Sequence, residues 1–169
     1  MSLTKISINN FRCFKNVDLQ LSPGINLFFG KNGSGKTSIL ESVFIFSSGK
    51  SFKSSNLMSL IKYEKEKFSI KGFDGTRGHI VEVEKSKSKS ISVLLNNKKT
   101  VTSKLIKEFP CTPIHNNTFS FADASPDFRR KLLDRSIFIA EDAFSACWFA
   151  YHRALKQRNG LLKNNRISD

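Results

Sequence analysis

Eight consecutive residues carry the clearest chemical signal in the chain: Gly30-Lys31-Asn32-Gly33-Ser34-Gly35-Lys36-Thr37. They fit the pattern G-x-x-x-x-G-K-[ST], which is typical of a loop that holds nucleotide phosphates. Glycines lack a Cβ atom, so the backbone can take positive φ and turn its N–H groups inward as an anion-binding nest. Lys36 would face the β- and γ-phosphates, and the Thr37 hydroxyl would bind Mg²⁺. The sequence therefore predicts a site for ATP and Mg²⁺ at residues 30–37.

The residues on either side of this loop predict the elements that must position it. Residues 25–29 (Ile-Asn-Leu-Phe-Phe) have the length and composition of a short buried strand. From Thr37 to Phe46, apolar residues recur at close to helical spacing. A helix that starts here would point the positive end of its dipole at a bound phosphate. We therefore expect a buried strand at 25–29, feeding the loop, and a helix over 37–46.

Period-two alternation predicts an antiparallel sheet around this unit. Residues 3–11 and 17–21 alternate apolar and polar, with Ile6 and Ile8 on one face. Residues 67–101 have the pattern of a β meander, with a turn signal at Asp74-Gly75. Its strands are expected over 68–70, 79–84 and 91–95, and a short helix is expected around 57–61.

The second half of the chain is predicted to be helical. Residues 102–109 have helical spacing, with Thr102 as a candidate N-cap. Ser125-Pro126-Asp127 is a strong start signal for a helix towards Ile139, and another is expected from about Glu141. The predicted fold class is α/β: a P-loop NTPase head lobe with an antiparallel β meander, followed by the start of a helical arm domain. The predicted boundary divides the chain into residues 1–122 and 123–169.

The composition favours a polyanionic partner in a reducing compartment. There are 28 Lys and Arg against 14 Asp and Glu, a formal net charge of +14. Such a surplus suggests nucleic acid before membrane, although a general basic bias that aids solubility is the alternative. Cys13, Cys111 and Cys147 are odd in number and widely spaced, which indicates a cytoplasmic protein. No signal peptide or transmembrane helix is expected.

Several basic residues outside the loop are candidates for ligand contacts. Arg12 lies between two aromatic residues, either to anchor a strand corner or to approach the nucleotide. Lys50 and Lys53 could contact a DNA backbone or be solvated, and the lysine-rich residues 85–90 could contact DNA or form a solvated hairpin tip.

Four stretches, in order, resemble the RecF family of bacterial recombination and repair ATPases, which is related to the SMC proteins: residues 3–12, 30–41, 125–134 and 151–163. The resemblance implies an ATP-binding head with a helical arm inserted into it. It implies binding to DNA at single-strand/double-strand junctions, recombinase loading with recombination mediator proteins, support of the SOS response, and a homodimer driven by ATP. It also implies that Arg12 lies near the nucleotide. Arg129 and Arg130 match a family pair, although a solvated helix face explains them equally well.

The resemblance covers only the N-terminal part of such a protein. No L-S-G-G-Q-like segment is present, and Ile137–Asp142 is only a weak match to a Walker B strand because it lies between two helical patterns. Hydrolysis needs such an acid beside the phosphate clamp. We therefore expect the chain alone to bind nucleotide weakly or not at all and to turn over negligibly. Thr112 and Asn116-Asn117 stand where the family commonly has a glutamine and a Pro-Glu pair.

The sequence also allows two other classes of function. One is a DNA-binding fragment without ATPase activity, which would bind DNA through its net positive charge. The other is a different P-loop NTPase, such as a GTPase or a small kinase. A GTPase should show N-K-x-D, and Asn97-Lys98-Lys99-Thr100 lacks the acid. The histidines at 79, 115 and 152 form no cluster in the sequence.

Overall fold

The computed structural model describes residues 2–114 and 125–164. The chain divides into two compact units, Met1–Ile114 and His115–Asp169. The predicted boundary between residues 122 and 123 lies outside the described residues and stays a prediction, as do the expected roles of Asn116 and Asn117.

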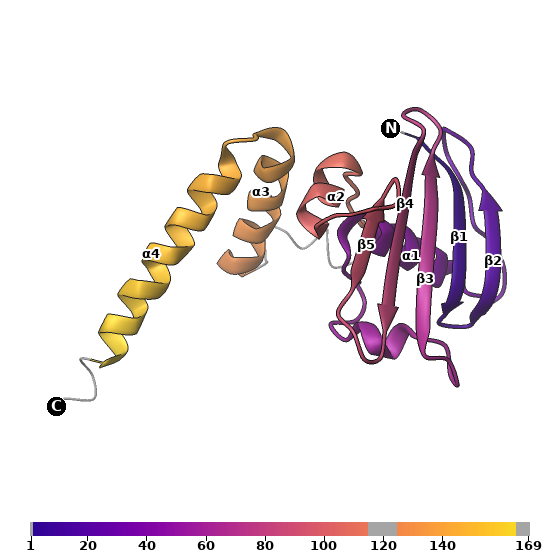
Figure 1. Cartoon of the computed structure of the whole chain (residues 1–169), viewed down its shortest axis with the longest axis horizontal. Coiled ribbons are helices and arrows are strands. Elements are labelled where there is room, and N and C mark those ends of the chain that lie inside the picture. The colour runs from indigo at the N-terminus through magenta and orange to yellow at the C-terminus, as the bar shows by residue number, and fades with distance from the viewer. Residues whose placement is uncertain (1, 115–124, 165–169) are drawn as a thin grey trace. The chain divides into compact units, whose positions relative to one another are not determined.

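The first unit is built on a six-stranded antiparallel sheet with the order β2-β1-β3-β4-β5-β6 (Figure 1). Its strands are β1 (Leu3–Phe11), β2 (Phe14–Gln20), β3 (Lys67–Asp74), β4 (His79–Ser86), β5 (Ser92–Leu95) and β6 (Lys98–Lys99). The predicted β meander is thereby confirmed, because β3 to β6 follow one another in both sequence and space. Asn97, where a GTPase motif would begin, forms the positive-φ turn between β5 and β6 together with Asn96.

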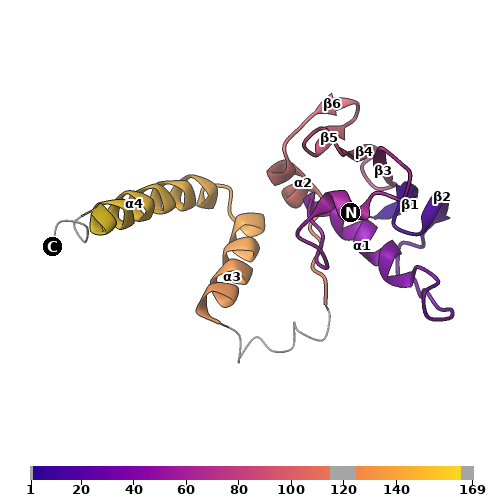
Figure 2. The ribbon, with the colours of Figure 1, turned by 90° about the horizontal axis from the view of Figure 1, so that it is seen from below.

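One face of this sheet is apolar and carries the core. The alternation of β1 places Ile6 and Ile8 on this face, fully buried as predicted. The same face continues through the alternate residues Phe68, Ile70, Val81, Val83 and Val93. Helix α1 (Lys36–Ser48) lies across this face and contributes Ile45 and Phe46 to the core (Figure 2).

Glycines terminate α1 at both ends. Gly35 is the N-cap with φ 94°, and Gly49 is the C-cap with φ 65°, whose N–H donates to the carbonyl of Ile45 at 2.8 Å. Both conformations lie in the left-handed region, which a residue without Cβ enters at little cost. The helix predicted over residues 37–46 is therefore confirmed and is slightly longer at each end.

Two short helices complete the first unit. The 3₁₀ helix η1 (Leu57–Leu60) begins where the Asn56 side chain accepts a hydrogen bond from Met58 N–H. Helix α2 (Thr102–Glu108) packs against α1 through Leu105 and through Phe109, which follows it. Thr102 was expected as the N-cap of this helix, but the N-cap is Val101. The Thr102 methyl group instead packs against Gly49, so its side chain does not cap α2.

The expectation of a buried strand at residues 25–29 is wrong. This segment belongs to no strand, and the side chains of Ile25, Leu27 and Phe29 are 95%, 82% and 88% exposed. A strand needs a neighbour to accept and donate its backbone hydrogen bonds. Within the described residues, neither edge strand of the sheet, β2 or β6, pairs with this segment. Two strands, rather than three, therefore precede the loop.

The second unit is a pair of helices, α3 (Pro126–Ala140) and α4 (Phe144–Asn164). The predicted start of α3 is confirmed, because the Ser125 hydroxyl accepts a hydrogen bond from Phe128 N–H and Pro126 is the first helical residue. Residues 137–140 are helical, so the alternative of a Walker B strand at Ile137–Asp142 is excluded. Phe144, Trp148 and Leu155 are half-buried on α4.

Candidate nucleotide-binding site

The loop at residues 30–37 has a backbone that glycine allows and other residues resist. Gly30, Gly33 and Gly35 have φ of 149°, 82° and 94°. At Gly35 there is also no space for a side chain, because an added Cβ would lie 2.4 Å from the Phe14 ring and 3.1 Å from Cys13 Sγ. The loop therefore packs closely against the β1–β2 turn as it enters α1, which holds its backbone in one conformation.

Lys36 is the first residue of α1, and its side chain folds back over the loop. Its Nζ donates hydrogen bonds to the carbonyls of Gly30 and Lys31 at 2.7 and 2.8 Å. These contacts hold the ammonium at the centre of the loop, next to the N-terminal end of a 13-residue helix. The unpaired N–H groups of the first helical turn add partial positive charge at the same place.

A pocket of about 400 Å³ opens in front of this loop. It is lined by Arg12, Cys13, Asn32, Gly33, Gly35, Lys36, Thr37, Ser38 and Lys53. Three of these side chains are cations and none is a carboxylate, so the pocket suits an anion. Together with the glycine backbone and the helix terminus, this lining has the chemistry of a phosphate site.

The structure brings Arg12 to the pocket and explains how it is held there. Its Nε and Nη2 donate to the two carboxylate oxygens of Glu41 at 2.8 and 2.9 Å. Glu41 lies on the buried face of α1 and is 1% exposed. A bidentate pair of this kind fixes the plane of the guanidinium as well as its position.

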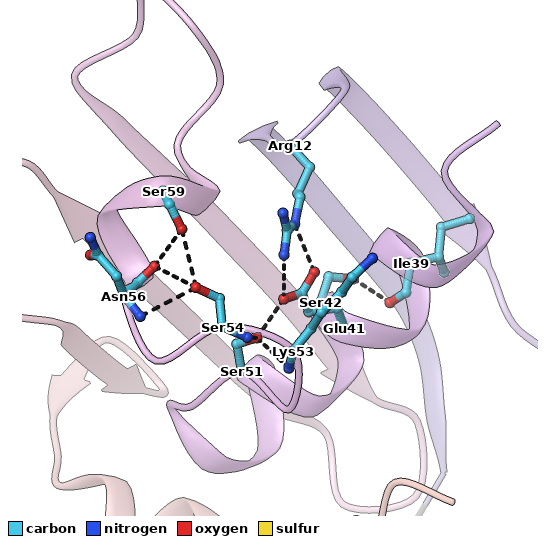
Figure 3. A network of polar contacts seen from close by, with 9 residues as sticks. All are labelled: Arg12, Ile39, Glu41, Ser42, Ser51, Lys53, Ser54, Asn56 and Ser59. Carbon is cyan, nitrogen blue, oxygen red and sulfur yellow. Dashed lines mark hydrogen bonds and ion pairs between the residues drawn. The ribbon is translucent and has the colours of Figure 1, made fainter. Parts of the chain in front are cut away.

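A chain of hydrogen bonds connects the same carboxylate to Lys53 (Figure 3). The Ser51 hydroxyl donates to Glu41, and it accepts hydrogen bonds from the backbone N–H groups of Lys53 and Ser54, each at 2.9 Å. The loop after α1 is thereby tied to the helix. Lys53, in this loop, lines the pocket.

The remaining predicted contact residues are Lys50 in the first unit and Arg129 and Arg130 in the second. Lys50 is exposed just after the Gly49 cap and does not line it. Arg129 and Arg130 lie on α3, in the second unit, where Arg130 forms an exposed ion pair with Asp127 at 3.0 Å. The expected DNA contacts of these three residues stay predictions. Lys53, the other predicted DNA contact, lines the nucleotide pocket.

The second unit has its own groove of about 390 Å³ between α3 and α4. Trp148 lines it and donates from Nε1 to Asp134 at 2.9 Å, while its ring lies 3.9 Å from that of His152. Asp127, Arg130 and Lys131 also line the groove, so it is mixed in charge. It lacks the uniform cationic lining of the loop pocket.

Thr37 is the one residue that the sequence predicts to bind Mg²⁺. It lines the pocket in the first turn of α1. In the described part of the chain, no group of three or more His, Cys, Asp and Glu side chains could hold a metal ion. A hydroxyl alone fits Mg²⁺ only together with nucleotide phosphates and water, which is how this ion is commonly held.

The residues of this arrangement that the sequence did not predict include Cys13, Glu41 and Ser51. Only Glu41 left a signal, because it is a carboxylate within the apolar stripe of a predicted amphipathic helix, and a buried charge needs a partner. Cys13 and Ser51 lie in loops, where the spacing of residues does not predict which groups a side chain will contact.

Comparison with known proteins first defines the class. A family described as "AAA domain" matches residues 5–164. The chain therefore belongs to this AAA domain family, in agreement with the P-loop and the α/β fold. Solved SMC heads support the same fold: one, from a study of ATP-driven dimerisation and DNA-stimulated activation of SMC ATPases, gives a TM-score of 0.63 at 18% identity over 80% of this chain and 99% of that chain.

Within this class, the predicted resemblance to RecF is confirmed. The "DNA replication and repair protein RecF" of Teredinibacter turnerae is 33% identical over 99% of this chain and 45% of that protein. That of Glaesserella parasuis is 37% identical over 98% of this chain and 47% of that protein. A solved structure of "the recombination mediator protein RecF-ATPrS in RecFOR pathway" gives a TM-score of 0.83 at 27% identity, over 96% of this chain and 45% of that chain. The chain spans about half the length of these relatives.

Proposed function

We propose that this chain is an ATP-binding part of a RecF-like DNA replication and repair ATPase, and that the pocket at residues 30–37 is its nucleotide site. One observation carries the proposal: the glycine loop, the ammonium of Lys36 and the start of α1 converge on one cationic pocket. In this proposal the loop N–H groups and Lys36 bind the phosphates of ATP. Arg12 and Lys53 add positive charge to the same pocket.

We further propose that the Thr37 hydroxyl binds Mg²⁺ together with the nucleotide phosphates. The ion would neutralise phosphate charge there. Among the described residues, no carboxylate lines the pocket to hold the Mg²⁺ shell or orient an attacking water, which supports weak binding without turnover by this chain alone. The exposed segment 25–29 also supports the proposal that the chain is part of a larger ATPase head. Its backbone is available to pair with a strand from the remainder of that head.

At the level of the whole protein, the proposal includes cytoplasmic DNA binding at single-strand/double-strand junctions, cooperation with recombination mediator proteins, support of the SOS response and ATP-driven homodimerisation. The RecF relatives and the formal charge of +14 support these roles. No helix among the described residues is long and apolar enough to cross a membrane. Lys50, Arg129 and Arg130 stay candidate DNA contacts.

Equilibrium binding of ATP with Mg²⁺, measured by calorimetry, tests the nucleotide site. We expect Lys36→Ala to weaken binding by about tenfold or more, since it removes a charge-assisted contact with phosphate. Lys31→Ala is the matched control, because this exposed lysine lies in the same loop and its side chain does not line the pocket. Equal losses in both variants would contradict the proposal. Steady-state turnover that depends on Lys36 would contradict the expected absence of hydrolysis.

A DNA-binding module without nucleotide function is the second candidate, and the charge of +14 favours it. Phosphate contacts would make its DNA affinity fall steeply with salt. DNA binding that is salt-dependent, unaffected by ATP and unaffected by Lys36→Ala, in a chain that does not bind ATP, would support this candidate over the first.

A further inference from the structure

We propose that Glu41 is a positioning residue for the nucleotide pocket: its buried carboxylate fixes Arg12 so that the unused edge of the guanidinium can bind a nucleotide phosphate. The proposal rests on the proposed nucleotide site and adds a residue to it. Glu41 does not line the pocket itself and would act through Arg12.

The burial of Glu41 shows that its position is determined by its partners. A carboxylate that is 1% exposed needs compensation for the water it has lost. Two nitrogens of Arg12 and the hydroxyl of Ser51 provide it. Apolar residues in place of a buried ion pair are often equally or more stable, so stability alone does not account for this pair beneath a pocket.

The geometry leaves Arg12 free to bind a second anion. A guanidinium has five N–H donors, and the contact through Nε and Nη2 uses one edge of it. The Nη1 group and the second Nη2 proton remain on the other edge. The Arg12 side chain is 27% exposed and lines the pocket that contains Lys36 and Thr37. Arg12 can therefore bridge Glu41 and a phosphate without releasing either.

The backbone of Arg12 is held as firmly as its side chain. Arg12 has φ 53°, in the left-handed region that residues with a Cβ rarely adopt. Its N–H donates to the carbonyl of Leu60 at 2.8 Å, so η1 stabilises this conformation. Unfavourable backbone conformations that persist in this way are concentrated at functional sites. Backbone and carboxylate together restrict the guanidinium to one place.

The same carboxylate also influences the second cation of the pocket. Ser51 donates to Glu41 and accepts from the N–H of Lys53, so removing the carboxylate would loosen the turn that carries Lys53. This second effect is indirect. Ser51→Ala separates the effect of Glu41 on Lys53 from its effect on Arg12, because this substitution leaves the bidentate contact between Glu41 and Arg12 intact.

A double-mutant cycle in ATP affinity tests the proposal, with wild type, Arg12→Gln, Glu41→Gln and the double variant. We expect each single substitution to weaken ATP binding by about tenfold, the size of one charge-assisted contact. The double variant should lose little more than Arg12→Gln, with any further loss no larger than that of Ser51→Ala, because Glu41 acts mainly through Arg12. Ser51→Ala should weaken binding by less than either. Circular dichroism verifies that each variant is folded, and Glu41→Asp replaces Glu41→Gln if that variant unfolds, with the same expected loss.

Additive losses in the double variant would overturn the positioning role, since Glu41 would then act through the stability of α1. An unchanged ATP affinity in Glu41→Gln would overturn it as well. Failure of the proposed function would give a different result, because wild-type protein would then show no ATP binding that depends on Lys36. The positioning role of Glu41 would be overturned in that case as well. An NMR signal from Arg12 Nε–H that is slow to exchange in wild type and lost in Glu41→Gln would support the pairing itself.

Discussion

Cys13 has a place in the structure that the sequence did not predict. In the sequence the three cysteines indicate only a reducing compartment. In the structure Cys13 is exposed, and it lines the nucleotide pocket beside Gly35. The contiguous residues 30–37 could be predicted because their pattern is local. Cys13 and Ser51 could not, because the pocket and the carboxylate that they contact come from other parts of the chain. For Glu41 the sequence indicated a buried charge but not its partner.

This position makes Cys13 a reporter of nucleotide binding. We expect ATP with Mg²⁺ to slow the reaction of Cys13 with a maleimide by about tenfold when the site is about nine-tenths occupied, because bound nucleotide covers the thiol. The rate is measured by mass spectrometry of labelled peptides. Cys147, which is exposed on α4 in the second unit, is the internal control and should react at an unchanged rate. An ATP-independent rate at Cys13 would place the nucleotide elsewhere.

At the scale of elements, the contact between α1 and the sheet depends on the absence of a side chain. An added Cβ at Gly72 of β3 would lie 2.4 Å from the Phe46 ring and 3.0 Å from Leu3 Cδ1. Gly72 therefore lets the helix that starts at the phosphate loop lie close to the strands. Alternation and helical spacing predicted both elements, but they did not predict which strand residue must be small where they meet.

Gly72→Ala should lower the free energy of unfolding by about 1–3 kcal/mol, the usual cost of forcing extra volume into a packed core. Urea unfolding followed by circular dichroism measures it. Gly24→Ala is the matched control in the same unit, because no atom lies within 4 Å of its added Cβ and its φ is not positive. It should change the stability by less than about 0.5 kcal/mol. Equal effects would mean that the helix-sheet contact tolerates a methyl group.

At the scale of the whole molecule, the segment 25–29 marks the limit of prediction from sequence. Its composition predicts a buried strand, and burial depends on a neighbour that the described residues do not provide. The strands of the meander were predicted correctly because each finds its partner in the adjacent hairpin. A local pattern indicates what a segment can form, and the rest of the molecule decides whether it does.

The acid stability of the first unit depends on a carboxylate at the end of β3. Burial tends to raise the pKa of Asp74, but hydrogen bonds from the backbone N–H groups of Ser2, Thr76 and Arg77 outweigh it, so the pKa of Asp74 lies below the ordinary 3.8. A lowered folded-state pKa stabilises the unit at pH above 3.8, and this contribution is lost as the pH falls through the folded value.

Asp74→Asn should therefore reduce stability at neutral pH and flatten the fall in stability below about pH 4. Urea unfolding at a series of pH values measures both effects. Glu66→Gln removes an exposed carboxylate whose ion pair with Lys87 is solvated, and it should leave the profile nearly unchanged. An Asp74→Asn profile parallel to that of wild type would contradict the assignment.

The exposed segment 25–29 also has a consequence for how the protein behaves at high concentration. It is a run of five residues without charge or proline, four of them apolar, and three large side chains point into solvent. Such segments pair readily with identical segments of other molecules to form cross-β aggregates. Lys31 is the nearest charge that could oppose this, and it lies outside the run, in the loop itself. Self-association through this segment would join copies of the protein beside the very loop that is expected to hold nucleotide.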